Sequence, residues 1–294
     1  MFAEMNMNKP FKKLLYFPVT KIILSTGICF AILVGVQNFI SKPVFYAIIP
    51  AKHIADTMVN YVSVAVLLVS YFYVFRVYEK REIKELSTKK LPAELFGGFI
   101  FGFSVLSVVM LILYVLGYYS IISISNFSYL LAPFSLLVVA ALIEEIFDRL
   151  IIYRILEDWM GTYWALLLMS TLFMIEHLAN DNISVLSIFL LLSFGFAHGT
   201  MYLYTKRLWL PFAFHLGWNF AQPFYGSNLS GIEDIGTIIK ARYEGPELLI
   251  GSRFGIEDSV LSILFISIIG IVFLQLSRKE GKIIRRKKSH SKSI

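Results

Sequence analysis

Four ionisable residues lie in the middle of an otherwise apolar stretch, LLVVAALIEEIFDRLIIYRIL, at positions 136–156. They are Glu144, Glu145, Asp148 and Arg149. A charged side chain is costly inside a bilayer, so ionisable residues in a membrane-length segment usually have a functional role. Glu145 and Arg149 are four residues apart, with the acid nearer the N-terminus, which favours an ion pair within one helix. Glu144 points about 100° away from Glu145, so that pair does not neutralise it.

Asp148 follows Glu144 by four residues, so a regular helix places both carboxylates on one face. Two neighbouring acids in a region of low dielectric are suited to the role of general base or metal ligand. The alternative interpretation is a buried ionic cluster that only fixes the packing of helices.

Two other apolar segments carry polar residues at helical spacing. Phe173 and His177 are four residues apart, and so are His215 and Asn219 in WLPFAFHLGWNF. Each pair alone is compatible with simple packing between helices. A rise of about 1.5 Å per residue places Glu144, His177 and Asn219 within one or two helix turns of a common depth. We therefore expect three helices to present a carboxylate, two imidazoles and an amide to one buried place.

Other features of the sequence are less informative. His198, in GFAHGTMY, is interpreted as a packing residue, and Glu176 as a carboxylate at the membrane interface. The single cysteine, Cys29, excludes a disulfide framework. The sequence contains no HExxH, GxSxG or Walker motif.

The composition predicts the fold class. The 294 residues are 57% hydrophobic and 16% aromatic, which exceeds the usual range of soluble domains. A helix needs about 20 apolar residues to cross the hydrocarbon core, and helices satisfy their own backbone hydrogen bonds there. We expect an all-α, polytopic membrane bundle of about eight helices, at 22–41, 58–76, 95–117, 128–155, 163–179, 184–205, 208–225 and 258–276.

The distribution of basic residues predicts the orientation. The net charge is +7, but Lys and Arg gather in alternate connections between apolar runs, which argues against nucleic-acid binding. Both termini are therefore expected in the cytoplasm. The protein itself is expected in a membrane, which is the cell membrane if the source is bacterial. We expect residues 1–277 to form a single membrane domain. Residues 278–294 would form a basic cytoplasmic tail in contact with anionic lipid.

Three ordered motifs on hydrophobic helices resemble a known family: EExxxR at Glu144, Glu145 and Arg149, then FxxxH ending at His177, then HxxxN at His215 and Asn219. This is the CPBP family, which comprises CAAX-type prenyl-protein endopeptidases and their bacterial relatives, the bacteriocin-processing or Abi proteins. The resemblance covers about 128–225. It implies an intramembrane endopeptidase of the metalloprotease type that acts on a membrane-associated or C-terminal peptide.

The resemblance also implies a role for each motif residue. Glu144, with His177, would activate a water for attack on a peptide carbonyl. His215 and Asn219 would stabilise the oxyanion. Glu145 and Arg149 would orient the site as an ion pair. Zinc or another divalent metal is compatible with Glu144, His177 and His215 as three ligands, and so is a metal-free glutamate mechanism.

Two departures and two alternatives accompany this interpretation. Asp148 stands where many family members have an aromatic residue, and Leu150 replaces a common Gly.

The first alternative is a non-catalytic bacteriocin immunity or scaffold protein that binds a partner. The second is a proton-coupled transporter, which the absence of sequence repeats does not favour. The expected partners are a peptide or protein substrate and the lipid bilayer.

Overall fold

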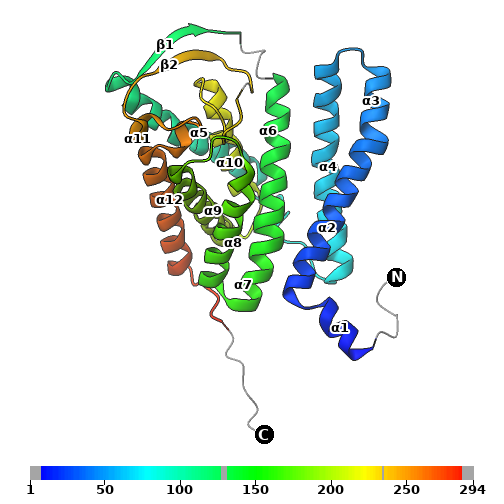
Figure 1. Cartoon of the computed structure of the whole chain (residues 1–294). Coiled ribbons are helices and arrows are strands. Elements are labelled where there is room, and N and C mark those ends of the chain that lie inside the picture. Colours follow the sequence, from blue (N-terminus) through cyan, green and yellow to red (C-terminus); the bar gives the residue numbers. More distant parts are fainter. Residues whose placement is uncertain (1–7, 127–130, 234, 287–294) are drawn as a thin grey trace.

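Long helices run roughly alongside one another and are covered at one end by two strands and several loops (Figure 1). The structure is a computed structural model, which describes residues 8–126, 131–233 and 235–286. The predicted all-α membrane bundle is confirmed. The two-stranded sheet is an addition that the sequence did not predict.

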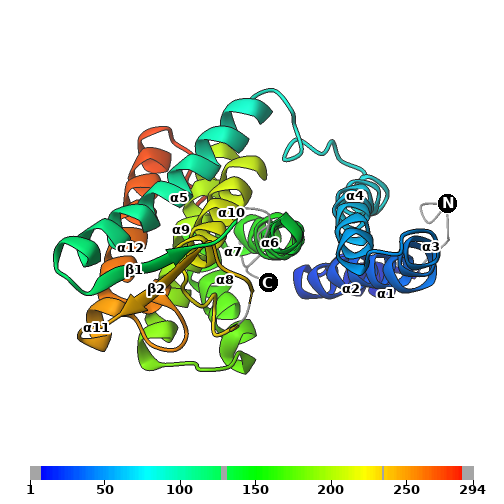
Figure 2. The same ribbon diagram turned by 90° about the horizontal axis from the view of Figure 1, so that it is seen from above.

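The N-terminal helices form a group to one side of the others (Figure 2). The short helix α1 (Lys9–Leu15) leads into α2 (Pro18–Val36), a π-helical turn (Gln37–Ser41) and α3 (Lys42–Ile48), which together form one long run. The run then reverses into α4 (Lys52–Tyr78). Helix α4 packs against both α2 and α6, so it joins this group to the rest of the bundle.

The remaining helices form the main body around α10. Helix α6 (Leu131–Glu144) continues through a π-helical segment (Glu145–Tyr153) into α7 (Arg154–Met160). Gly161, whose φ of 86° suits a residue without a side chain, ends this run. The other elements are α5 (Leu91–Val115), α8 (Thr162–Glu176), a 3-10 turn (His177–Ala179), α9 (Val185–Thr205), α10 (Trp209–Phe224), α11 (Glu247–Ile250), a second 3-10 turn (Ile256–Asp258) and α12 (Val260–Lys279).

Strands β1 (Tyr119–Ile124) and β2 (Ile239–Tyr243) pair antiparallel, with Tyr119 opposite Tyr243. The sheet joins the connection after α5 to the long connection after α10. It therefore covers the end of the bundle that is opposite to α1 (Figure 1).

Two glycines let α5 and α10 approach each other closely. A Cβ added to Gly102 would lie 2.1 Å from the carbonyl oxygen of Phe214, and one added to Gly217 would lie 2.1 Å from that of Phe99. These separations are far below van der Waals contact, so only glycine fits at either position. The contact fixes the position of α10 relative to α5, and α10 carries His215 and Asn219.

Within the described residues, six helical segments are long and apolar enough to cross a membrane: Pro18–Ile48, Lys52–Tyr78, Leu91–Val115, Thr162–Ala179, Val185–Thr205 and Val260–Lys279. Helices also occur at the other two predicted positions. One is the α6–α7 run, which contains the charged motif, and the other is α10, which has 16 residues. The α6–α7 run differs from the six by its charged residues, and α10 differs by its shorter length. The number of membrane spans therefore lies between six and eight.

Helix α1 and the end of α12 lie at the same end of the bundle (Figure 1). An even number of crossings, six or eight, gives this arrangement. The side of the membrane on which they lie stays a prediction. Helix α12 ends at Lys279, just inside the predicted tail, and residues 287–294 of that tail lie outside the described residues.

Candidate active site

The helix that carries EExxxR changes its geometry within the motif. Regular α-helix ends at Glu144, and residues Glu145–Tyr153 form a π-helix. Such wide turns leave backbone groups imperfectly matched and are frequent at functional sites. Glu145, Asp148 and Arg149 are buried, whereas 27% of the Glu144 side chain is exposed. Glu144 is therefore the acid of this motif that an incoming molecule can reach.

The predicted ion pair is confirmed. Arg149 Nε lies 3.3 Å from Glu145 Oε2, and its Nη1 donates a hydrogen bond of 3.1 Å to Asp148 Oδ2. The guanidinium also lies over the ring of Phe173, 4.8 Å from its centre. Arg149 thus offsets two buried carboxylates and connects the motif to α8. Asp148, which the sequence placed on the same face as Glu144, contacts Arg149 and is not part of the cavity that Glu144 lines.

Both predicted imidazoles turn the same ring nitrogen toward Glu144. His177 Nε2 lies 3.9 Å from Glu144 Oε2, and His215 Nε2 lies 3.7 Å from the same oxygen. His177 Nδ1 lies 2.8 Å from the carbonyl oxygen of Phe173, and His215 Nδ1 lies 2.9 Å from Glu145 Oε1. A carbonyl and a carboxylate only accept, so each Nδ1 carries the proton. In the neutral rings, each Nε2 then offers a lone pair toward Glu144.

These groups line one cavity of about 350 Å³. Asn219 also lines it, one helical turn beyond His215, and only 8% of this residue is exposed. The predicted carboxylate, two imidazoles and amide therefore come together. The rest of the lining comes from α6, α8, α9 and two loops: Ala140, Phe173, Glu176, Asn180, Leu190, Leu191, Phe194, Leu229, Ser230, Ile232 and Glu257.

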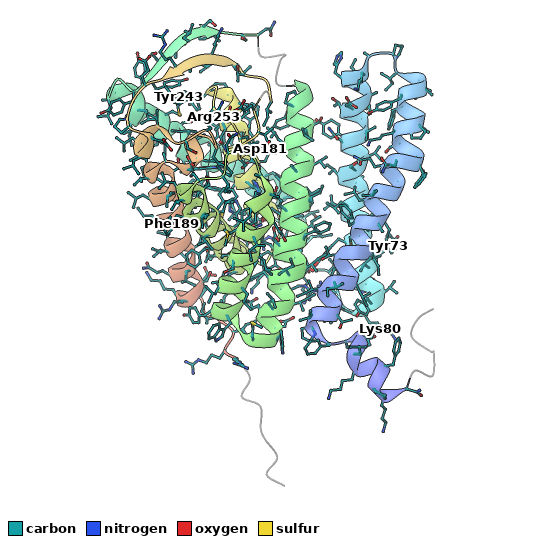
Figure 3. The ribbon with its side chains drawn as sticks, viewed as in Figure 1. Tyr73, Lys80, Asp181, Phe189, Tyr243 and Arg253 are labelled. Atoms are coloured by element: carbon teal, nitrogen blue, oxygen red, sulfur yellow. The ribbon has the colours of Figure 1, made fainter. Side chains whose placement is uncertain are left out.

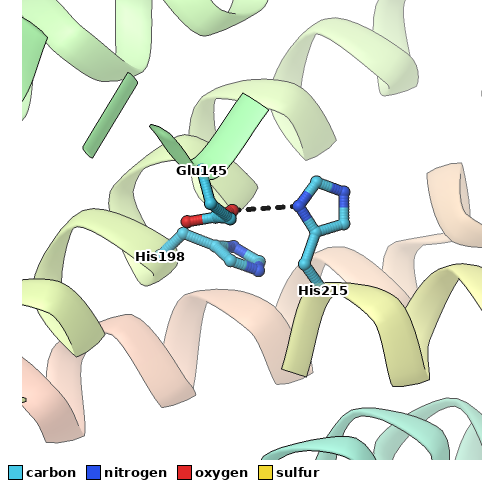
Figure 4. A group of neighbouring side chains, drawn as sticks. All are labelled: Glu145, His198 and His215. Carbon is cyan, nitrogen blue, oxygen red and sulfur yellow. Dashed lines mark hydrogen bonds and ion pairs between the residues drawn. The ribbon is translucent and has the colours of Figure 1, made fainter. Parts of the chain in front are cut away.

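A second group of possible metal ligands lies deeper in the bundle. The ligand atoms of Glu145, His198 and His215 lie within 4.8 Å of one another, and all three residues are buried (Figure 4). His198 Nδ1 is 2.9 Å from the carbonyl oxygen of Phe194, and its buried Nε2 has no hydrogen-bond partner among the described residues. This set shares only His215 with the predicted ligands Glu144, His177 and His215.

Electrostatics favour the predicted set over the deeper one. Arg149 already neutralises Glu145, so a divalent cation bound there would face a guanidinium in a region of low dielectric. His177 and His215 are held as metal-binding imidazoles usually are, with Nδ1–H donated to an oxygen and Nε2 free, and His198 is held in the same way. Donor atoms around tetrahedral zinc lie about 3.4 Å apart. The separations of 3.7 and 3.9 Å from Glu144 are near that value, but the ligand atoms of Glu144, His177 and His215 do not all lie within 4.8 Å of one another, so the two imidazoles would have to approach each other to share an ion.

Sequence reasoning did not identify Glu257 as a site residue. Its buried carboxylate accepts hydrogen bonds from Trp218 Nε1 and Gln222 Nε2 on α10, and from the backbone and hydroxyl of Ser230. Burial raises the pKa of this carboxyl above its usual value, although the hydrogen bonds oppose the shift. Glu257 joins the loop at the edge of the cavity to the helix that carries His215. Its distance from the motifs in the sequence concealed this role.

One comparison with known proteins identified a match. Residues 125–221 match the family model described as "Type II CAAX prenyl endopeptidase Rce1-like". This segment contains all six predicted site residues: Glu144, Glu145, Arg149, His177, His215 and Asn219. No curated protein and no solved structure matches the chain.

Proposed function

We propose that this chain is a protease of the CPBP family, as the match over residues 125–221 supports, and that it hydrolyses peptide bonds at Glu144. One observation carries the proposal. The Glu144 carboxylate, in a cavity within a membrane bundle, faces the Nε2 atoms of two imidazoles at 3.7 and 3.9 Å. A structural ion pair would instead make direct contacts and exclude water.

The separations suit a bound water. They are longer than a direct hydrogen bond, but a water lying beside the pair can be about 2.8 Å from both the oxygen and a nitrogen. Glu144 then accepts a proton from the water as the oxygen attacks the peptide carbonyl, and later passes the proton to the leaving amine. His177 orients this water with its Nε2 lone pair.

Two donors are available for the oxyanion of the tetrahedral intermediate. Asn219 offers its amide N–H groups, and His215 offers Nε2–H when it is protonated. Glu145 accepts from the other nitrogen of His215, which stabilises the imidazolium and fixes the orientation of the ring. Arg149 offsets the charge of Glu145 and holds it in place for this purpose. The ion pair therefore acts through His215 and does not touch the substrate.

The same residues offer one carboxylate and two imidazoles as ligands to a divalent cation. Glu144, His177 and His215 would hold it, and the cavity leaves a fourth position open to water. Such an ion lowers the pKa of a bound water and polarises a carbonyl. The positions of Asn219 and Glu145 are the same with or without it.

Cleavage of a peptide library tests the proposal. Purified chain in detergent is incubated with a proteome-derived peptide mixture, and new termini are identified by mass spectrometry. The unmodified chain and an exposed control, Glu82→Gln, whose side chain is 73% exposed, should generate the same new termini. Glu144→Gln and His177→Gln should generate none. Equal cleavage by Glu144→Gln would refute the assignment, and binding of peptides without cleavage would favour the scaffold alternative.

A further inference from the structure

The cavity is closed toward the end of the bundle where α1 and α12 end. Beyond Glu144, residues 148–153 are all buried, and Arg149, Leu150 and Tyr153 are each 0% exposed. One turn further, the buried Glu157 accepts hydrogen bonds of 2.9 Å from both Tyr153 and Thr162. A packed and hydrogen-bonded layer thus separates Glu144 from the lower end in Figure 1.

The cavity opens toward the opposite end. Its lining includes Glu176, which is exposed, and Ile232, which is 56% exposed. Asn180 Nδ2 donates to the carbonyl oxygen of Ser230 at 2.9 Å, so the loop with Ile232 is fixed beside the end of α8. Asp181, the next residue, lies at the upper end of the bundle together with Arg253 (Figure 3). Ile232 therefore marks the mouth of the cavity, and this mouth lies away from the termini.

Charge distinguishes the two ends. Among the residues that the structure describes, eighteen Lys and Arg residues lie at or near the lower helix ends and their connections, where Lys80 is found (Figure 3). The upper end has five: Lys42, Lys52, Lys240, Arg242 and Arg253. Because basic connections are retained in the cytoplasm, this distribution predicts that the lower end is the cytoplasmic one.

The position of the cavity mouth and the distribution of charge together indicate the side from which substrate enters. We propose, on the basis of the endopeptidase function proposed above, that the site takes peptide segments from the non-cytoplasmic side of the membrane. An exported peptide, or an external loop of a membrane protein, can pass Ile232 and reach Glu144. A lipid-modified C-terminal tail in the cytoplasm meets the closed end. The substrate class is therefore a peptide on the non-cytoplasmic face.

Cysteine labelling tests the side of the mouth directly. Cys29 is the chain's only cysteine, so a Cys29→Ala background is free of thiols. A membrane-impermeant maleimide is added to intact cells that express Ile232→Cys, Arg253→Cys or Lys84→Cys in this background. Arg253 and Lys84 side chains are 81% and 79% exposed. Ile232→Cys and Arg253→Cys should be labelled in intact cells, and Lys84→Cys only after permeabilisation.

The reverse pattern would overturn the proposal, because it would place the mouth in the cytoplasm. Should Ile232→Cys fail to accumulate, Arg253→Cys still reports the side of the upper end. Labelling needs no catalysis, so it can succeed even if the proposed function fails.

A second measurement connects the mouth to the chemistry. A peptide that the purified chain cleaves is added outside intact cells, with Glu144→Gln cells as the background. Cleavage above that background should fall at least tenfold when Ile232→Cys is first modified with an impermeant polyethylene-glycol maleimide of about 5 kDa. Unchanged cleavage after complete modification would contradict entry past Ile232.

Discussion

Replacing Gly102 with alanine tests how the contact between α5 and α10 positions the site. The new Cβ would lie 2.1 Å from the carbonyl oxygen of Phe214, and real Cβ contacts are essentially never below 3.0 Å. The two helices must therefore separate locally by roughly 1 Å. His215 follows Phe214 directly, so the imidazole would move with the displaced backbone.

The expected magnitudes follow from this displacement. Overpacking of this kind costs about 1–3 kcal/mol, and in a chain of this size each kcal/mol lowers Tm by about 2–4 °C. We thus expect Gly102→Ala to lower Tm by about 2–12 °C. A shift of about 1 Å at a catalytic group can reduce the rate roughly 100-fold, so kcat/KM should fall by one to two orders of magnitude.

Gly97→Ala is the matched control on the same helix, since no atom lies within 4 Å of its added Cβ. Alanine is favoured over glycine in helices by about 1 kcal/mol, so Tm should stay the same or rise. Thermal unfolding in detergent and peptide cleavage measure both effects. If Gly102→Ala matched Gly97→Ala in Tm and in kcat/KM, the close contact between α5 and α10 would not position the site.

Three other perturbations test separate parts of the site. Arg149→Gln leaves two buried carboxylates without a cation and should lower the free energy of unfolding by about 3–5 kcal/mol. The control Lys84→Gln removes one partner of an exposed ion pair and should lower it by less than about 1 kcal/mol. Equal losses would contradict the ion-pair role of Arg149. The pKa of Glu257 is raised in the folded chain, so its contribution to stability is lost as pH rises above its unfolded pKa of about 4.3. Glu257→Gln should therefore make Tm depend less on pH above about pH 4, and an unchanged slope would contradict this. Elemental analysis after zinc loading should show that His177→Ala loses bound zinc and His198→Ala keeps it; the opposite result would favour the deeper group.

Helical periodicity and the order of three motifs were sufficient to predict the helices and the convergence of Glu144, His177, His215 and Asn219. Periodicity assumes regular α-helix, however, and the π-helical segment after Glu144 departs from it. Asp148 accepts a hydrogen bond from Arg149 and does not line the cavity that contains Glu144. A local departure of this kind depends on the packing of neighbouring helices, which the sequence pattern does not contain.

The remaining features depend on contacts between distant parts of the chain. The β1–β2 pairing joins residues near 120 to residues near 240, and neither strand has a turn signal that links it to the other. His198 has the spacing of an ordinary packing residue, and only the folded chain places it beside Glu145. Glu257 contacts α10 through a loop with no helical period. Chain topology, more than residue type, determined these positions.

A double-mutant cycle on Glu144 and His215 tests most directly whether these residues act together on one reacting group. Values of kcat for Glu144→Gln, His215→Gln and the double variant are compared on the same peptide, with Tm measured to confirm folding. Groups that act as a unit are strongly non-additive. We expect each single variant to lose nearly as much activity as the double variant. Losses in the single variants that multiply in the double variant, or cleavage that survives in Glu144→Gln, would contradict the account.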